Sequence, residues 1–306
     1  MRILISGSTG FLGTAVIEAL ERDGHTIARL VRPQTSRGKA TGGAEQTVAW
    51  DPVAGTLDAA GAEDADALVH LAGASIAGGR WNASRKNLLR TSRIDATRHL
   101  FGALGKLQRP PRVILGASAI GYYGSRGDET VSEASAPGGD FLSAVCQEWE
   151  KETARGAEFG ARVASLRFGI ILAAHGGALP KMLTPFQLGV GGRLGSGRQW
   201  MSWVTLEETV RMVQFALANA AISGPVNVVA PNPVRNSEFT RVLAKTLHRP
   251  ALFPAPAFAL RLALGEMADA LLLSSQRVMP AKLAGAGYQF QQPDLAEALG
   301  DVLQKK

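Results

Sequence analysis

The stretch Gly7-Ser8-Thr9-Gly10-Phe11-Leu12-Gly13 stands between a short apolar run, Ile3–Ser6, and a helical pattern over Thr14–Arg22. Glycines fill the first, fourth and seventh positions of the stretch. A strand, a glycine turn and a helix in this order let backbone N–H groups and the helix N-terminus approach a pyrophosphate closely. The seven residues therefore predict a dinucleotide-binding turn of the Rossmann type. The alternative is a tight turn that holds no ligand.

Short apolar runs alternate with longer helical patterns along most of the chain. The predicted strands are Ile3–Ser6, Thr26–Val31, Ala67–Leu71, Arg112–Leu115, Arg162–Arg167 and Val226–Val229. The predicted helices are Thr14–Arg22, Arg85–Leu104, Phe141–Arg155 and Leu206–Ala218. Such alternation builds a parallel sheet covered by helices on both faces. We therefore predict an α/β fold with a doubly wound parallel sheet.

The last third of the chain changes character. Prolines punctuate short helical patterns there, at Pro231, Pro233, Pro250, Pro254, Pro256, Pro280 and Pro293. We predict a Rossmann domain over residues 1–175 and a smaller, mostly helical substrate lobe over 176–306, with about 198–230 returning to the Rossmann sheet. A pocket for a small-molecule substrate is expected where the lobe meets the sheet.

Cysteine and histidine usage excludes two kinds of site. The 306 residues include one cysteine, Cys146, so the chain forms no internal disulfide and no cysteine-based zinc site. The five histidines show no metal-ligand spacing, and we predict no metal.

No targeting or membrane segment is expected. The N-terminal strand runs straight into the glycine turn without a secretion signal. The apolar segment Phe258–Leu273 is interrupted by Arg261, Glu266 and Asp269, which predicts an amphipathic or packed helix and no membrane span. We expect a cytoplasmic protein.

The net charge of +7 and the pI near 9.8 raise the question of a nucleic-acid partner. The cations gather after the second strand and around one helix, at Arg29, Arg32, Arg37 and Lys39 and at Arg80, Arg85, Lys86, Arg90, Arg93 and Arg98. No nucleic-acid reading motif accompanies them. We favour a solvated or cofactor-facing surface and predict no nucleic-acid partner.

Arg32 bears on the choice between the two nicotinamide dinucleotides. A site for NAD places a carboxylate about twenty residues beyond the glycine turn, where it binds the ribose 2′-hydroxyl. This chain has Arg32 at or next to that point, and a guanidinium suits a 2′-phosphate. We therefore predict NADP(H) as the cofactor. The alternative is an exposed surface arginine.

Motifs beyond the glycine turn extend over the whole chain. They are His70-Leu71-Ala72-Gly73-Ala74, Arg80-Trp81, Ser92-Arg93-Ile94, Ser118-Ala119-Ile120-Gly121-Tyr122-Tyr123-Gly124, Trp149-Glu150, Leu166-Arg167-Phe168-Gly169, Gly195-Ser196-Gly197-Arg198-Gln199-Trp200 and Ser275-Gln276-Arg277-Val278-Met279-Pro280. With them the chain resembles the extended short-chain dehydrogenases/reductases. It is similar to an atypical branch, the epimerase family proteins labelled NAD-dependent epimerase/dehydratase or SulA homologue. The resemblance implies a dinucleotide over Gly7–Gly13 and a backbone wall at Leu71, Ala72 and Gly73 beside the adenosine half.

The catalytic pair of the superfamily is missing. A Tyr-x-x-x-Lys pair usually moves the proton there, because the lysine lowers the pKa of the tyrosine. No tyrosine in this chain has lysine four residues on, and the matching positions before Trp149 carry Leu142 and Cys146. Arg93 falls about where typical extended members of the resembled superfamily have an asparagine. Met201 falls about where nucleotide-sugar epimerases have an arginine that holds the diphosphate of the substrate. A nucleoside-diphosphate sugar is therefore a poor substrate candidate.

Ser118, Tyr122 and Tyr123 remain as candidate catalytic residues. Ser118 matches the active-site serine of the resembled family, and its hydroxyl can orient a substrate carbonyl. The two tyrosines lie close to it in sequence and carry phenol protons. A serine that caps a turn and tyrosines that only pack are the alternatives.

The glycine-rich segment from Gly189 to Gly197 carries Arg193 and is followed by Arg198. It is expected either to close over an anionic substrate or to serve as a flexible connector. Gln199, Trp200 and Trp203 beside it suggest a pocket wall or, in our preferred interpretation, core.

Two functions compete. The first is an NADP(H)-binding oxidoreductase or epimerase-like enzyme with a small substrate and an unusual proton donor. The second is a non-catalytic NADP(H)-binding regulatory or sensor protein, because a fold alone does not establish chemistry.

The resemblance also implies a homodimer formed through the two helices over Arg85–Leu104 and Phe141–Arg155.

Overall fold

A computed structural model describes residues 1–33 and 46–304, so Arg37 and Lys39 lie outside the described residues. Its main element is an eight-stranded sheet in the order β13-β8-β6-β5-β1-β2-β3-β4. The strands are β1 (Arg2–Ser6), β2 (Thr26–Val31), β3 (Gln46–Asp51), β4 (Thr56–Leu57), β5 (Ala67–His70), β6 (Val113–Ala119), β8 (Arg162–Phe168) and β13 (Gly224–Val228). All pairings are parallel except that of β4 with β3.

The strand order reverses between β1 and β5, because the chain first builds outward to β3 and then returns to build the other half. In doubly wound sheets the ligand crevice opens at this reversal, at the carboxyl ends of the strands. The predicted α/β fold with a doubly wound parallel sheet is confirmed.

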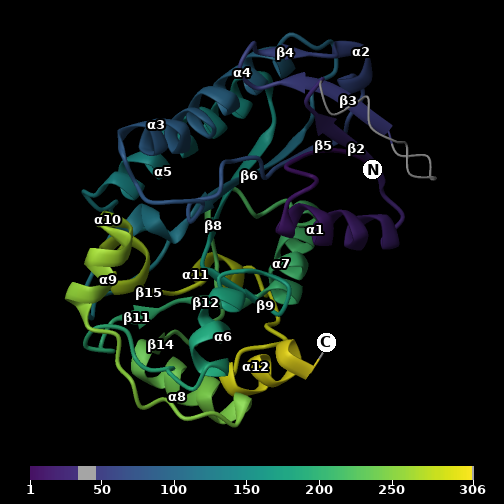
Figure 1. Ribbon diagram of the computed structural model, residues 1–306. Helices are drawn as coiled ribbons and strands as arrows, with labels where there is room; N and C mark the ends of the chain where they lie inside the picture. Colours follow the sequence, from purple (N-terminus) through teal and green to yellow (C-terminus); the bar gives the residue numbers. More distant parts are fainter. Residues whose placement is uncertain (34–45, 305–306) are drawn as a thin grey trace.

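Helices cover both faces of the sheet (Figure 1). The helices α1 (Phe11–Arg22) and α7 (Leu206–Ala218) lie on one face, and α4 (Ile94–Leu104) and α5 (Phe141–Ala154) lie on the other. Strand β1 shows why both faces are covered: Ile3 and Ile5 pack with the first helix pair, whereas Leu4 packs with α4. A strand that is buried on both faces has a continuous run of apolar residues. Such a run is the pattern from which β1 was predicted.

Two helix predictions were wrong in detail. The predicted helix Arg85–Leu104 is two helices, α3 (Ala83–Thr91) and α4, and the break at Ser92–Arg93 turns the Arg93 side chain inward to donate to the Ala74 carbonyl. The apolar segment after Pro256 forms α9 (Ala257–Leu264), α10 (Glu266–Ala268) and a π-helical turn, Asp269–Leu273. The helix α9 ends at Gly265, where φ is +63°. Residues with a side chain rarely adopt this backbone conformation, whereas glycine adopts it readily.

The C-terminal third packs below the sheet in Figure 1 and has its own core. Besides those already described, the elements that follow β8 are β9 (Ile170–Ala173), β10 (Gly176–Gly177), α6 (Leu179–Gln187), β11 (Trp200–Met201), β12 (Trp203–Thr205), β14 (Val234–Arg235), α8 (Asn236–Leu247), β15 (Arg277–Val278), α11 (Ala281–Gly285) and α12 (Leu295–Gln304). Two short elements come earlier in the chain, α2 (Ala59–Ala62) and β7 (Thr130–Val131). β13 completes the main sheet, whereas β12 pairs with β9 in a separate three-stranded sheet.

One buried carboxylate ties the C-terminal segment to α7. Glu208 accepts hydrogen bonds from the Tyr288 hydroxyl and from the backbone N–H groups of Gln291 and Gln292, at 2.9 and 2.7 Å for the two amides. Glu208 is 1% exposed. A buried carboxylate needs such donors. The contact therefore holds residues 288–292, which lead into α12, against α7.

Candidate functional site

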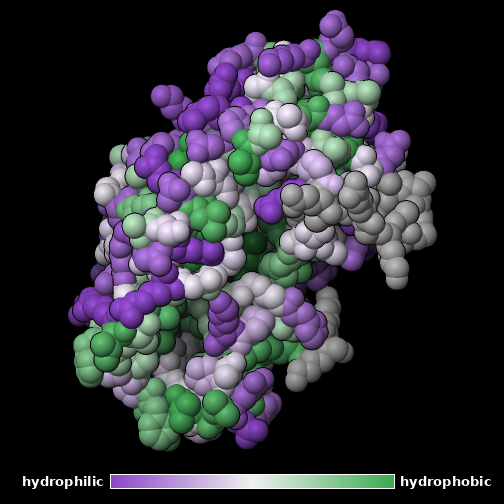
Figure 2. Space-filling model, turned by 45° about the horizontal axis from the view of Figure 1, so that its top comes forward, coloured by the Kyte–Doolittle hydropathy of each residue, from purple (hydrophilic) through white to green (hydrophobic). Residues whose placement is uncertain are grey.

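A cavity of about 410 Å³ lies where the strand order reverses and where the C-terminal third meets the sheet. Figure 2 shows the molecule hollowed near the centre of this face, with hydrophobic residues at the bottom of the hollow. One end of the cavity is lined by Gly7, Gly10, Phe11, Leu12, Gly13 and Leu71. The other end is lined by Trp200, Met201, Ser202, Leu271, Leu272 and Gln276, and Ser118, Leu142 and Cys146 lie between.

The glycine turn leaves no room for side chains. A Cβ on Gly13 would lie 2.2 Å from the Gly7 carbonyl oxygen, and one on Gly7 would lie 2.8 Å from the Leu71 carbonyl carbon. Gly10 caps α1 without any side-chain hydrogen bond, so the first N–H groups of the helix remain available. A close-packed glycine cradle at a helix N-terminus fits the pyrophosphate of a dinucleotide.

The other predicted cofactor residues lie around this cradle. Ser8 is buried, Thr9 is exposed, and neither lines the cavity. Ala72 and Gly73 follow Leu71 directly behind the cavity wall. Arg32 follows the end of β2, and β2 pairs in parallel with β1, so its backbone stands at the same edge of the sheet as the turn.

A buried hydrogen-bond chain holds the wall after β5. Ser6 Oγ accepts from the Leu71 and Ala72 N–H groups, each at 3.2 Å, so its own proton goes to His70 Nδ1 at 2.6 Å. His70 Nε2 then donates to Thr97 Oγ1 at 2.9 Å, which also accepts from Trp149 Nε1 at 3.0 Å. This chain requires a neutral imidazole, and burial lowers the pKa of His70 to about 4.

Ser118 does not offer its proton to the cavity. Its hydroxyl donates to Glu150 Oε1 at 2.6 Å, and Arg167 donates to both oxygens of Glu150 at 2.7 Å. Ser118 is 3% exposed and Arg167 is 2% exposed. The serine is therefore oriented by a buried ion pair, and its remaining capacity is to accept a hydrogen bond.

The prediction of Tyr122 and Tyr123 as proton donors is not supported by the geometry. Neither residue lines the cavity. Tyr123 is fully buried, donates to Asn227 Oδ1 at 2.7 Å and accepts from Arg167 Nη1 at 2.9 Å, and burial raises its pKa to about 12. The Tyr122 ring stacks on the Arg167 guanidinium at 3.4 Å. Both tyrosines follow β6 in a 3₁₀ turn that directs their side chains to the network behind the cavity.

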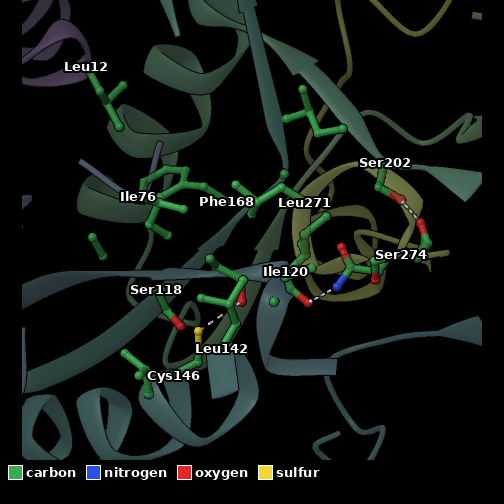
Figure 3. Close-up of a pocket in the computed structure, with 18 of the residues that line it drawn as sticks. Leu12, Ile76, Ser118, Ile120, Leu142, Cys146, Phe168, Ser202, Leu271 and Ser274 are labelled. Atoms are coloured by element: carbon green, nitrogen blue, oxygen red, sulfur yellow. Dashed lines mark hydrogen bonds between the residues drawn. The ribbon is translucent and has the colours of Figure 1, made fainter. Parts of the chain in front are cut away.

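Leu142 and Cys146 line the cavity beside Ser118, as Figure 3 shows. The Cys146 thiol donates a weak hydrogen bond to the Ala119 carbonyl at 3.7 Å, and burial raises its pKa to about 11. A thiol with this pKa stays protonated at neutral pH and is a poor acid. This wall of the cavity is therefore apolar and does not provide a ready proton.

The C-terminal end of the cavity is built from residues that are tied to one another. Gln199 Nε2 donates to the carbonyls of Leu194 and Leu272, each at 3.0 Å, and Leu194 N donates to Asn236 Oδ1 at 2.8 Å. Trp203 is core, whereas Trp200 lines the cavity. The glycine-rich segment contributes Leu194, while Arg193 and Arg198 do not line the cavity.

Glu150, Arg167 and Arg93 belong to the site but escaped identification from the sequence. All three stand in the motifs of the family resemblance, and the parallel register of β6 and β8 brings Ser118 opposite Arg167. Arg93 lines the cavity because of the helix break that precedes it. No pattern in the sequence indicates either the register or the break.

No group of three or more His, Cys, Asp or Glu side chains in residues 1–33 and 46–304 could hold a metal ion. None of the helices described is long and apolar enough to cross a membrane.

Comparison with known proteins adds family matches. Residues 3–229 match the model of the NAD dependent epimerase/dehydratase family, and residues 255–302 match a domain of unknown function, DUF1731. An epimerase family protein of Mycobacterium bovis is 41% identical over 298 residues, covering 97% of this chain and 96% of that protein. The epimerase family protein YfhF of Bacillus subtilis is 38% identical, covering 99% and 98%.

A solved structure resembles the chain over its full length. The crystal structure of the human epimerase family protein SDR39U1 (isoform2) with NADPH superimposes with a TM-score of 0.89 at 31% identity, and the match covers 100% of both chains. The likeness therefore includes both the sheet and the C-terminal third.

Proposed function

Because the chain belongs to the NAD dependent epimerase/dehydratase family, we propose that it is an NADP(H)-dependent oxidoreductase or epimerase-like enzyme with a small substrate. One observation carries the proposal: the glycine cradle, Ser118 and the C-terminal residues Leu271 and Gln276 all line a single cavity. When bound there, the dinucleotide supplies or receives a hydride. The C-terminal residues enclose the space next to it in which a substrate would lie.

The residues around the turn support NADP(H) over NAD(H). The N–H groups of the first turn of α1 bind the pyrophosphate, and Arg32 binds the 2′-phosphate. Asp51, at the end of the next strand, turns its Oδ1 to the Val53 and Ala54 N–H groups, at 2.8 and 3.0 Å, and Arg32 helps to lower the pKa of its carboxyl. The human relative whose structure contains NADPH supports the same choice.

Ser118 and Glu150 are proposed to handle the proton. A substrate hydroxyl next to Ser118 donates to Oγ, and the serine proton already points at Glu150 Oε1, 2.6 Å away. As a hydride leaves the substrate carbon, the hydroxyl proton moves to Ser118 Oγ and the serine proton moves to Glu150. Arg167 donates to both oxygens of Glu150 and so holds the carboxylate against the Ser118 hydroxyl, and the reverse reaction follows the same path.

Titration calorimetry with NADPH and NADH tests the cofactor. We expect tighter binding of NADPH, and Arg32→Ala should remove the preference by weakening NADPH alone, since a hydrogen bond to a charged group is worth about 1.5–3 kcal/mol. Equal affinities, or tighter NADH, contradict the cofactor assignment.

Hydride transfer from NADPH deuterated at C4 to a panel of small carbonyl compounds tests the reaction. Deuterium in the product, lost in Ser118→Ala with NADPH affinity unchanged, is the expected result. Deuterium transfer that survives Ser118→Ala contradicts the role proposed for the serine.

A second candidate is a non-catalytic NADP(H)-binding regulatory or sensor protein. It is favoured by the apolar wall of Leu142 and Cys146, where related enzymes keep the tyrosine and lysine. Tight NADPH binding without deuterium transfer to any carbonyl of the panel would support this candidate over the enzyme.

We also propose a cytoplasmic homodimer that pairs through α4 and α5. The outward faces of these helices carry the ion pair of Arg98 with Glu152 at 2.8 Å, so the paired surface would be charged. Light scattering at micromolar concentration tests this, and a monomeric mass excludes the dimer.

A further inference from the structure

Arg93 is a buried cation without a carboxylate. It is 9% exposed, and within residues 1–33 and 46–304 no acidic side chain lies within 4.0 Å of its guanidinium. Burial lowers the pKa of Arg93, the nearby Arg85 lowers it further, and no carboxylate is among the groups that act on it. Buried charges in proteins are normally paired, because removing an ion from water costs several kcal/mol.

Protein groups use only part of its hydrogen-bonding capacity. Nη1 donates to the Leu89 carbonyl at 3.2 Å and Nη2 donates to the Ala74 carbonyl at 3.0 Å. A guanidinium has five N–H donors, so these two bonds leave three without a partner in the described chain. The ring of Trp149, 5.2 Å away, covers one side of the group without accepting an N–H bond along its edge.

Two other arginines, the buried Arg167 and the half-buried Arg162, show how this chain satisfies a guanidinium that needs no ligand. Arg167 is paired with Glu150. Arg162 donates to three carbonyls that follow or end α7, those of Ala216, Leu217 and Ile222. Neither residue lines the cavity, whereas Arg93 does.

The guanidinium lies between the two functional parts of the cavity. A Cβ on Gly73 would lie 3.3 Å from Arg93 Cζ, so the group packs directly against the wall expected beside the dinucleotide. Cys146, which lines the same cavity as Arg93 and Ser118, is close enough to affect the pKa of Arg93. An anion bound to Arg93 could therefore be part of the cofactor or part of the substrate.

We propose that Arg93 is an oxyanion-binding residue of the cavity, with its free N–H groups donating to a phosphate of the dinucleotide or to a carboxylate of the substrate. The inference rests on the proposed dinucleotide site for the first source but not for the second. In either case the bound oxyanion supplies the negative charge that no carboxylate of the described chain provides for Arg93.

The experiment compares Arg93→Met, Arg93→Gln and Arg93→Lys with the wild-type full chain. Arg93→Met keeps the length and removes the charge, and Arg93→Gln retains a donor for one carbonyl and serves where the methionine variant does not fold. Arg98→Met removes an exposed arginine of α4 and is the matched control. Calorimetry measures NADPH binding, and it also measures the binding of benzoate, a simple carboxylate, to the NADPH complex.

A dinucleotide phosphate is the source if the uncharged variants weaken NADPH about tenfold or more while Arg93→Lys retains most of the affinity. A substrate carboxylate is the source if NADPH binds normally to the uncharged variants but saturable benzoate binding is lost. The proposal is overturned if the uncharged variants bind both probes as Arg98→Met does. A wild-type chain that does not bind NADPH refutes the proposed function, and benzoate added to the free protein then decides the role of Arg93.

Discussion

Ser118 of β6 and Arg167 of β8 stand opposite each other in the parallel register of the two strands, and the carboxylate of Glu150 bridges their side chains. Arg167 also donates to Tyr123, which donates to Asn227 of β13. The candidate catalytic serine is thus the cavity end of a polar network that crosses three strands of the sheet. Changes to the network should affect both the stability of the fold and the orientation of the serine.

Glu150→Leu should lower the free energy of unfolding by about 3–5 kcal/mol, because it leaves the Arg167 guanidinium buried without a counter-ion. Urea denaturation measures the change. Glu148→Leu on the same helix is the control: its pair with Arg90 is exposed, and its loss should cost less than about 1 kcal/mol. Similar costs for the two variants would contradict the structural role given to Glu150.

Tyr123→Phe should reduce stability and leave hydride transfer intact. The substitution removes the partner of Asn227 Oδ1 and of Arg167 Nη1, which should cost about 1–3 kcal/mol. Thermal unfolding measures this cost, and deuterium transfer from labelled NADPH measures the reaction. Tyr122→Phe retains the ring against Arg167 and should change stability by less than about 0.5 kcal/mol. Loss of transfer in Tyr123→Phe at full NADPH occupancy would restore the tyrosine to the catalytic site.

Gly13→Ala should abolish tight NADPH binding and destabilise the fold, because the new Cβ would stand 2.2 Å from the Gly7 carbonyl oxygen and force the turn apart. Calorimetry and urea denaturation measure the two effects. Gly102→Ala, within α4, is the control: a Cβ there meets nothing within 4 Å, and the helix should gain about 0.5–1 kcal/mol. Unchanged NADPH affinity in Gly13→Ala would show that the turn does not hold the cofactor.

His70 should make the protein less stable in acid. The unfolded side chain binds a proton below its ordinary pKa of 6.5, whereas the folded one does so only below about 4. As the pH falls from 6.5 to 4, this residue therefore lowers the free energy of unfolding by up to about 1.4 kcal/mol per pH unit, and it adds no change above or below that window. Urea denaturation across this range measures the slope.

His70→Gln is the control for that slope, since glutamine stays neutral and can still bond to Ser6 and Thr97. The variant should show a shallower dependence between pH 6.5 and 4. Identical slopes in the two proteins would mean that His70 is not the group that titrates.

The fold was predictable where local sequence and tertiary packing agree. The apolar run of β1 and the glycine turn need no distant partner to be recognised. Strand β3 was missed, because Gln46–Asp51 mixes polar and apolar residues at a position near the sheet edge, where only one side is strongly buried. The break at Ser92–Arg93 was missed because no proline or glycine marks it.

Of the residues predicted for the site, Ser118, Leu71 and most of the glycine turn line the cavity. Closeness in sequence suggested that Tyr122 and Tyr123 share the environment of Ser118, but the 3₁₀ turn after β6 directs them away from the cavity. Glu150 reaches Ser118 from a helix, and Arg167 does so from a neighbouring strand. Such relationships depend on register and helix placement, which a single sequence does not specify.

The cavity takes its walls from both ends of the chain, from Gly7 near the start to Gln276 near the finish. Protein synthesis proceeds from the N-terminus, so the glycine cradle leaves the ribosome long before the residues of the opposite cavity wall. Tyr288 and its contact with Glu208 come later still. A nascent chain can thus form the glycine turn well before the cavity can close around it.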